Sequence, residues 1–181
     1  MKLISKEIES KFGKKILFNE KLANYSWFNL GGPSEVFFKP SSIEDIIFFL
    51  KKVKPKTITI LGAGSNTLVR DGGVKGIAIK LSSHFSYLKL ESPNIIEAGA
   101  ATLDKKIADF ASENSLTGLE FLSCIPGSIG GGIRMNSGCY GQDISQILHS
   151  IKTVDIFGVE KDIPASDIQF YYRDSSFDHN L

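Results

Sequence analysis

Apolar residues recur at the spacing of an amphipathic helix in three stretches of the chain. Their apolar positions are Ile4, Ile8 and Phe12; Ile43, Ile46, Ile47 and Leu50; and Leu103, Ile107, Phe110 and Ala111. Ser41 and Glu44 have the spacing of a capping box, so the second helix is expected to begin there and to end before Pro55. Thr102 is expected to cap the third helix.

Stretches rich in β-branched and other apolar residues predict strands between these helices. The expected strands cover residues 57–61, 67–69, 76–81, 87–90, 95–96 and 151–157, and residues 165–170 are expected to form a short helical turn. Helices and strands mix without strict βαβ alternation, which predicts the α+β class. A boundary near His84 divides the chain into a first subdomain of residues 1–83 and a second of residues 84–181.

The overall composition argues against a nucleic-acid-binding protein. Hydrophobic residues make up 42% of the 181 residues and charged residues 23%, which is typical of a folded globular chain. The formal net charge is +1. Because affinity for nucleic acid comes mostly from clustered Lys and Arg, no nucleic-acid partner is expected.

The apolar runs are too short for membrane association. None approaches the roughly 20 residues that span a bilayer, and residues 2–15 carry charge throughout, with no apolar signal core. We therefore expect a cytoplasmic protein with no membrane partner. Cys124 and Cys139 fit that compartment as free thiols, and without a histidine cluster nearby they make a poor metal site, so no metal is expected.

A loop of small residues follows the expected strand 57–61. It comprises Gly62, Ala63, Gly64, Ser65 and Asn66. A dinucleotide-binding fingerprint would need a third glycine and a helix, but Thr67 takes that position and the next residues look like a strand. Glycines let backbone N–H groups turn toward an anion such as a pyrophosphate, while an ordinary tight turn between strands explains the same residues.

A second glycine-rich segment covers residues 126–138. Ordering so many glycines is entropically costly, which makes sense where main chain lies flat against a planar ring. A flexible surface loop is the alternative. Ile125, Ile129, Ile133 and Met135 are interleaved with the glycines and call for burial, so we expect a loop that is held against another part of the protein.

The third candidate site is the segment 171–175. Arg173 remains charged at any relevant pH and its guanidinium can bind a carboxylate or an enolate through two hydrogen bonds. The alternative is a surface arginine that pairs with Asp174.

These segments, taken in order, resemble the UDP-N-acetylenolpyruvoylglucosamine reductases. The matching stretches are residues 29–32, 62–66, 68–73, 118–122, 125–131, 134–141 and 172–175. Each stretch is modest alone, but the ordered set is specific and extends from about residue 23 to residue 176.

The resemblance implies a fold, two cofactors and a reaction. The fold is a two-subdomain FAD-binding module of the vanillyl-alcohol-oxidase type. In this family NADPH reduces FAD, and hydride then passes to the enolpyruvyl double bond of UDP-N-acetylglucosamine enolpyruvate. The product, UDP-N-acetylmuramate, is a precursor of peptidoglycan.

The resemblance also assigns roles to residues. The FAD pyrophosphate is expected to contact Gly62, Ala63, Gly64, Ser65, Asn66 and Thr67. The flavin ring is expected to lie near Pro126, Gly127, Ser128, Gly131, Asn136 and Gly138. Tyr172 is expected to face the UDP-sugar substrate. Arg173 is the expected catalytic residue, stabilising the enolate-like charge that develops as hydride arrives.

The chain departs from the family pattern after the arginine motif. The family uses a proton donor, usually a serine, and a glutamate near its C-terminus, whereas this sequence stops at Leu181. The resemblance therefore implies a complementing C-terminal segment for turnover. Two alternatives remain open: a non-catalytic FAD-binding fragment or remnant, and another flavoprotein of the same fold, such as an oxidase.

Overall fold

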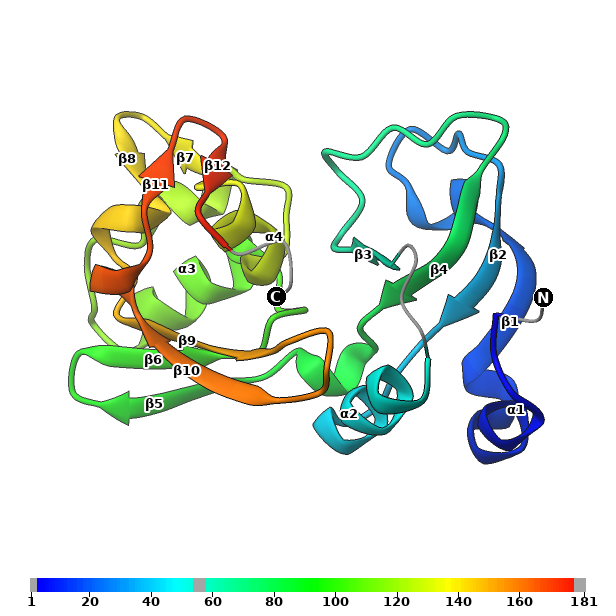
Figure 1. The fold of residues 1–181 in the computed structure, drawn as a ribbon. Coiled ribbons are helices and arrows are strands. Elements are labelled where there is room, and N and C mark those ends of the chain that lie inside the picture. Colours follow the sequence, from blue (N-terminus) through cyan, green and yellow to red (C-terminus); the bar gives the residue numbers. More distant parts are fainter. Residues whose placement is uncertain (1–2, 54–57, 178–181) are drawn as a thin grey trace. The chain divides into compact units, whose positions relative to one another are not determined.

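The computed structural model describes residues 3–53 and 58–177, and its chain divides into two compact units (Figure 1). The first unit contains residues 1–82 and 154–159, and the second contains residues 83–153 and 160–181. Pro55 and Thr57, at the predicted helix end and strand start, lie outside the described residues.

A four-stranded sheet organises the first unit. Its elements are α1 (Lys6–Phe12), β1 (Ile16–Lys21), β2 (Pro33–Phe38), α2 (Ile43–Lys52), β3 (Ile58–Leu61) and β4 (Val74–Lys80). The strand order is β1-β2-β4-β3, with β1 antiparallel to β2 and the other pairs parallel. The crossover through α2 therefore leaves room for β4 between β2 and β3.

Alternating side chains of this sheet enter two separate cores. Val36 and Phe38 of β2 pack with residues of α1 and α2, and the Phe38 ring stacks on Phe49 at 4.1 Å between centroids. Phe37, between them, points to the other face, where it packs with Leu61. The stripe predicted for α1, Ile4, Ile8 and Phe12, therefore covers this face of the sheet. The stripe predicted for α2 is wrong, because α2 packs on this core through Phe48 and Phe49, while Ile43 of the predicted stripe is 41% exposed.

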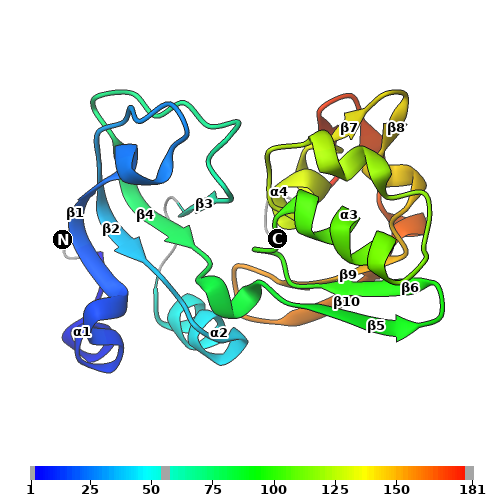
Figure 2. The ribbon, with the colours of Figure 1, turned by 180° about the vertical axis from the view of Figure 1, so that it is seen from behind.

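The second unit consists of short elements around one core. They are β5 (Leu88–Ser92), β6 (Ile95–Ala98), α3 (Asp104–Glu113), α4 (Ile129–Arg134), β7 (Gly138–Cys139), β8 (Gln142–Asp143), β9 (Ser150–Val154), β10 (Glu160–Pro164), β11 (Phe170–Tyr171) and β12 (Asp174–Ser175). Its strands form antiparallel pairs, and α3 lies along the β5–β6 hairpin (Figures 1 and 2). Ile107, Leu122 and Ile144 are central to the core.

The starts of α2 and α3 each differ from the sequence prediction by one residue. In α2 the cap is Ser42, whose hydroxyl accepts a hydrogen bond from Asp45 N at 3.2 Å, while the Asp45 carboxylate accepts one from Ser41 N at 3.0 Å. The capping pair is therefore Ser42 and Asp45, not Ser41 and Glu44. Asp45 also binds Lys15 Nζ at 2.6 Å, which favours this register.

The start of α3 was predicted wrongly for a tertiary reason. The Thr102 hydroxyl donates to Tyr87 O at 3.0 Å instead of capping the helix, and α3 begins after Leu103. The buried stripe consequently shifts to Asp104, Ile107, Ala108 and Ala111, and Leu103 is exposed.

The predicted strand at residues 67–69 is also wrong. This segment runs as irregular loop to β4, with Val69 buried beside Leu61 and Leu68 exposed. Val69 is buried by the loop itself and not by strand pairing. Within the described ranges, no helix combines the length and the apolar character that crossing a bilayer requires.

The first sheet has both buried and exposed aromatic side chains, so the contribution of a buried ring to the free energy of unfolding can be tested. Replacing the fully buried Phe38 by Ala should lower the free energy of unfolding by about 3–5 kcal/mol, because it removes a stacked ring and leaves a cavity. The matched control is Phe18→Ala on the neighbouring strand, where the ring is 52% exposed and the loss should stay below about 1 kcal/mol. Urea unfolding followed by Trp27 fluorescence measures both, and equal losses would contradict the assigned core.

Candidate functional site

The loop after β3 is shaped by direct main-chain contact. Gly64 is buried and has a φ of +81°, and a Cβ built there would lie 2.0 Å from Tyr25 O. Trp27 N donates to Gly64 O at 3.1 Å. Only glycine can occupy position 64, because both the backbone angle and the contact exclude a side chain.

The same loop contains backbone N–H groups without an acceptor in the described part of the chain. Within the described part of the chain, the N–H groups of residues 63–66 donate to no hydrogen-bond acceptor. Consecutive free N–H groups on small residues form sites for anions, so this loop suits a diphosphate. Thr67, at the end of the loop, helps to hold the loop in place, because its carbonyl accepts a hydrogen bond from the Ser26 hydroxyl at 3.3 Å.

Two further glycines hold this loop to the segment before β2. Gly32 N donates to Arg70 O at 3.0 Å, and a Cβ on Gly32 would lie 1.9 Å from Asp71 O. A Cβ on Gly73 would lie 1.8 Å from Pro33 O. The stretches 29–32 and 68–73, which the sequence singles out separately, are thus two sides of one contact.

The second glycine-rich segment contains a helix and not a continuous loop, which corrects the sequence expectation. Residues Gly130, Gly131 and Gly132 lie in α4, where Gly130 N donates to Ala100 O at 3.0 Å. A Cβ on Gly130 would lie 2.9 Å from that same oxygen. Glycine is a poor helix former, so tertiary packing and not intrinsic preference produces this helix.

A buried carboxyl group lies against this segment. Asp104 is fully buried, and neither of its carboxylate oxygens has a hydrogen-bond partner among the described residues. A Cβ on Gly127 would lie 2.6 Å from Asp104 Oδ2, and one on Gly132 would lie 3.6 Å from Oδ1. Burial raises the pKa of Asp104 from 3.8 to about 7, since desolvation disfavours the charged form.

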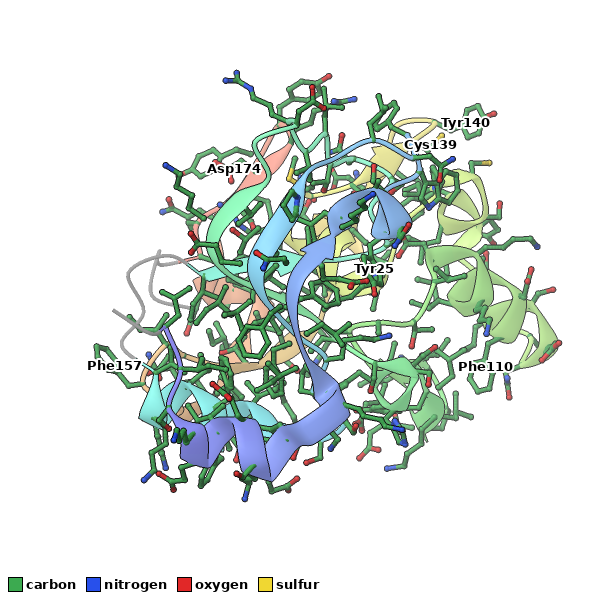
Figure 3. The ribbon with its side chains drawn as sticks, turned by 90° about the vertical axis from the view of Figure 1, so that its right-hand side faces the viewer. Tyr25, Phe110, Cys139, Tyr140, Phe157 and Asp174 are labelled. Atoms are coloured by element: carbon green, nitrogen blue, oxygen red, sulfur yellow. The ribbon has the colours of Figure 1, made fainter. Side chains whose placement is uncertain are left out.

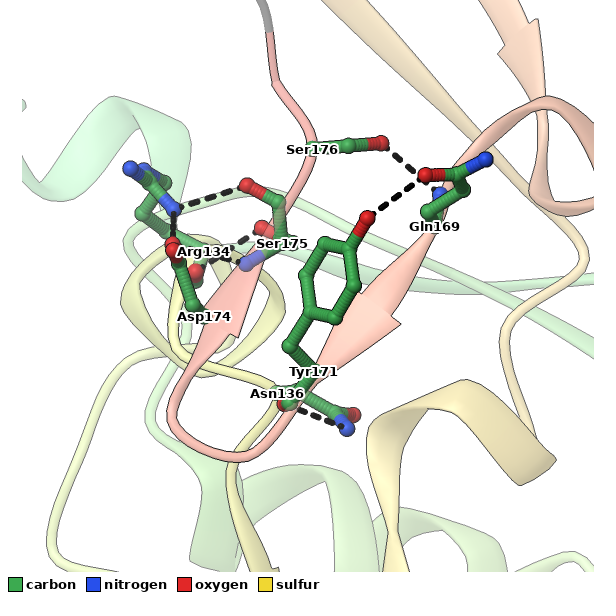
Figure 4. A network of polar contacts seen from close by, with 7 residues as sticks. All are labelled: Arg134, Asn136, Gln169, Tyr171, Asp174, Ser175 and Ser176. Carbon is green, nitrogen blue, oxygen red and sulfur yellow. Dashed lines mark hydrogen bonds and ion pairs between the residues drawn. The ribbon is translucent and has the colours of Figure 1, made fainter.

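The hairpin of β11 and β12 carries the third candidate site at its turn (Figure 4). Tyr172 is 90% exposed, and Arg173 has a φ of +56° with its guanidinium carbon 5.9 Å from the Tyr172 ring centroid. No carboxylate among the described residues pairs with Arg173, because Asp174 pairs with Arg134 instead. The alternative of an Arg173–Asp174 pair is therefore wrong.

Residues of the second segment attach this hairpin to the unit (Figure 4). Besides its ion pair with Asp174, Arg134 donates to Ser175 O at 3.0 Å, and the Ser175 hydroxyl donates to Arg134 O at 2.8 Å. Asn136 Nδ2 donates to Tyr171 O at 3.3 Å, and its Oδ1 accepts from Ser145 N. Asn136, predicted to lie near the flavin, thus also supports the hairpin that presents Arg173.

The structure divides the predicted site residues between the two units. Residues 62–67 belong to the first unit, whereas residues 126–138, Tyr172 and Arg173 belong to the second. Within the second unit, the glycine-rich segment and the arginine hairpin are joined by Arg134 and Asn136. Their contacts with cofactor and substrate remain predictions.

Two residues of this arrangement were missed from the sequence. Asp104 occupies a buried helical position three residues before Ile107, and a carboxylate at such a position was a usable signal. Arg134 had no comparable signal, since its partners Asp174 and Ser175 lie 40 and 41 residues away.

Comparison with known proteins places the chain in a family. The model of the FAD binding domain matches residues 34–159. UDP-N-acetylenolpyruvoylglucosamine reductase of Pelagibacter ubique is 44% identical over 177 residues, which is 97% of this chain and 59% of that protein. The crystal structure of the Thermus caldophilus UDP-N-acetylenolpyruvylglucosamine reductase matches with a TM-score of 0.76 and 27% identity, over 90% of this chain and 56% of that one.

The chain belongs to the FAD binding domain family, and its cofactor is FAD. The resemblance to the UDP-N-acetylenolpyruvoylglucosamine reductases is confirmed, although the chain spans little more than half the length of these relatives. p-Cresol methylhydroxylase, 12% identical, matches with a TM-score of 0.58 over 87% of this chain and 34% of its own. The predicted α+β module of the vanillyl-alcohol-oxidase type is therefore confirmed as the fold.

The buried carboxyl group makes the stability of the protein depend on pH. Because the pKa of Asp104 is higher in the folded chain than in the unfolded one, its contribution is most favourable below about pH 4 and is lost as pH rises to about 7. The change over that range should be roughly 4 kcal/mol. The Asp104→Asn variant lacks this dependence, so the difference in unfolding free energy between wild type and variant should fall by that amount.

Urea unfolding followed by far-UV circular dichroism, at several pH values between about 4 and 8, measures the difference. Taking the difference cancels the carboxylates whose pKa values are lowered, such as Asp45, which act in the opposite direction. A difference that stays constant with pH would show that Asp104 is not held in a buried, unpaired state.

Proposed function

We propose that this chain is the FAD-binding part of a reductase that uses NADPH to reduce UDP-N-acetylglucosamine enolpyruvate to UDP-N-acetylmuramate. The observation that carries the proposal is the 44% identity to the Pelagibacter ubique reductase, which extends over 97% of this chain. The hairpin supports it, because Arg173 is exposed at a turn that Arg134 and Asn136 anchor.

The bound FAD supplies the hydride chemistry. In the first unit, the free N–H groups of residues 63–66 bind its diphosphate, with side-chain donors from Ser65 and Asn66. In the second unit, the residues assigned to the flavin ring are Pro126, Gly127, Ser128, Gly131, Asn136 and Gly138. Of these, Gly127 lies directly against Asp104, where a larger residue would not fit.

Arg173 acts on the substrate. Hydride addition to the enolpyruvyl double bond places enolate-like charge on the substrate carboxylate, and a fixed guanidinium stabilises that charge more than it stabilises the ground state. Tyr172, exposed beside it, contacts the UDP-sugar. The proton donor and the C-terminal glutamate of the family belong to a complementing segment outside the matched region. Such a reductase makes a precursor of the cell wall in the cytoplasm, with neither nucleic acid nor membrane as a partner.

The anion-binding role of the first loop can be tested in this chain. Asn66→Asp places a carboxylate beside the diphosphate, and like-charge repulsion should weaken FAD binding by roughly tenfold or more. Asn94→Asp, an equal charge change in the exposed turn between β5 and β6, is the control and should leave the affinity unchanged. The measurement is quenching of flavin fluorescence on titration, and equal affinities in the two variants would contradict the diphosphate assignment.

The role of Arg173 requires a protein of full family length. Arg173→Lys keeps the charge but loses the paired hydrogen-bond geometry, so FAD reduction by NADPH should be unchanged. Reoxidation of the reduced flavin by the enolpyruvyl substrate should slow by roughly a hundredfold or more. Anaerobic stopped-flow absorbance separates the two half-reactions. Equal reoxidation rates in variant and parent would remove Arg173 from the mechanism.

A further inference from the structure

Two lysines occupy neighbouring positions on adjacent strands at the end of the first sheet, beside the loop of residues 62–67. The parallel register pairs Phe37 of β2 with Ala78 of β4, and Phe38 with Ile79, so the next positions along the two strands are Lys39 and Lys80. On its other side Lys80 pairs with Leu61, the last residue of β3. Both lysines therefore lie at the carboxyl ends of parallel strands, where ligands of such sheets bind.

Both side chains lie on the face that carries the loop. Side chains alternate along a strand, so Lys39 shares a face with Phe37, and Lys80 shares one with Ala78. Tyr25, labelled in Figure 3, is the aromatic residue of this face. Its ring stacks on Phe37 with centroids 4.5 Å apart, and Lys39 Nζ lies 5.8 Å from the Tyr25 centroid. Lys80 Nζ donates to Gly62 O, the first carbonyl of the loop.

These two charges lack a compensating acid. Among the described residues no carboxylate lies within ion-pair distance of Lys39 or Lys80, and the nearby Glu20 accepts a hydrogen bond from the Tyr25 hydroxyl at 2.9 Å. Burial and the charge of Lys39 lower the pKa of Lys80. Like charges on neighbouring strands repel each other, so an anion bound beside the two lysines would stabilise the arrangement.

We propose that Lys39 and Lys80 complete the site formed by the backbone N–H groups of residues 63–66, and that together they bind a diphosphate. The inference rests on the proposed function, because the loop chemistry makes the diphosphate of FAD the occupant. The lysines supply two positive charges, and the N–H groups supply oriented hydrogen bonds. The diphosphate of the UDP-sugar is the other source of the same chemistry, and the experiment separates the two.

The experiment measures dissociation constants of the flavin-free chain for four probes: FAD, ADP, riboflavin and UDP-N-acetylglucosamine. Lys39→Met and Lys80→Met should each weaken FAD and ADP binding by roughly tenfold and leave riboflavin, which has no phosphate, unaffected. Lys80→Arg keeps the charge and should retain most of the affinity. Lys106→Met, the same charge change at an exposed position of α3, should bind all probes as wild type does.

Salt provides a second readout. Weakening of FAD binding by added salt should be less steep in the double Met variant than in wild type, since fewer charges take part. Lys39→Met is the key single variant, because the Lys39 side chain makes no hydrogen bond to the loop, so the substitution removes its charge and its contact with the Tyr25 ring but no hydrogen bond of the loop. Wild-type melting temperatures and Trp27 fluorescence in the variants would show that the fold is intact.

The outcomes separate this inference from the proposed function. Unchanged affinity for FAD, ADP and UDP-N-acetylglucosamine in both Met variants would overturn the lysine site and leave the proposed function standing. Loss of affinity for UDP-N-acetylglucosamine with unchanged FAD affinity would overturn FAD as the occupant. A wild-type chain that binds ADP through the lysines but does not bind FAD would support the diphosphate site and count against the proposed function.

Discussion

The first unit depends on direct contacts between main-chain segments of the same chain, which lie too close together for a side chain to fit between them. Gly32, Gly64 and Gly73 each place a would-be Cβ within about 2 Å of a carbonyl oxygen of the opposite segment. The contact at Gly64 uses its carbonyl, as acceptor for Trp27, and leaves the N–H groups of residues 63–66 free. The packing that holds the loop thereby also determines which of its groups can meet an anion.

In the second unit, a glycine of the short helix α4 makes a similar close contact with the main chain. Gly130 lets α4 approach the main chain at Ala100, and Gly127, just before α4, lies against the carboxyl group of Asp104, in both cases closer than a Cβ would allow. That approach places Arg134, the last residue of α4, where it anchors the hairpin. The segment assigned to the flavin and the turn that presents Arg173 are therefore parts of one hydrogen-bonded assembly, and a change in α4 would be felt at both.

The sequence predicted what depends on local periodicity and missed what depends on distant partners. The apolar stripe of α1 was correctly identified, because a buried face repeats along a helix, whereas β1 and β2 were not predicted and α2 turns Phe48 and Phe49 to the core in place of the predicted stripe. Thr102 failed as a cap because Tyr87 offers its hydroxyl a tertiary partner. The helix at residues 129–134 was missed because packing overrides the poor helix preference of glycine. The pairing of Lys39 with Lys80 needs the strand register, which periodicity alone does not provide.

Each unit holds a half-buried or buried ionisable group whose surroundings oppose its charge, Lys80 in the first and Asp104 in the second. Burial shifts the pKa of Asp104 upward and that of Lys80 downward, so both move toward their neutral forms. Asp104 is sealed within the second unit, so only a proton can relieve it, and its contribution depends on pH. Lys80 is half-buried, and the diphosphate proposed to bind beside it would balance its charge, so its contribution to stability would depend on the ligand.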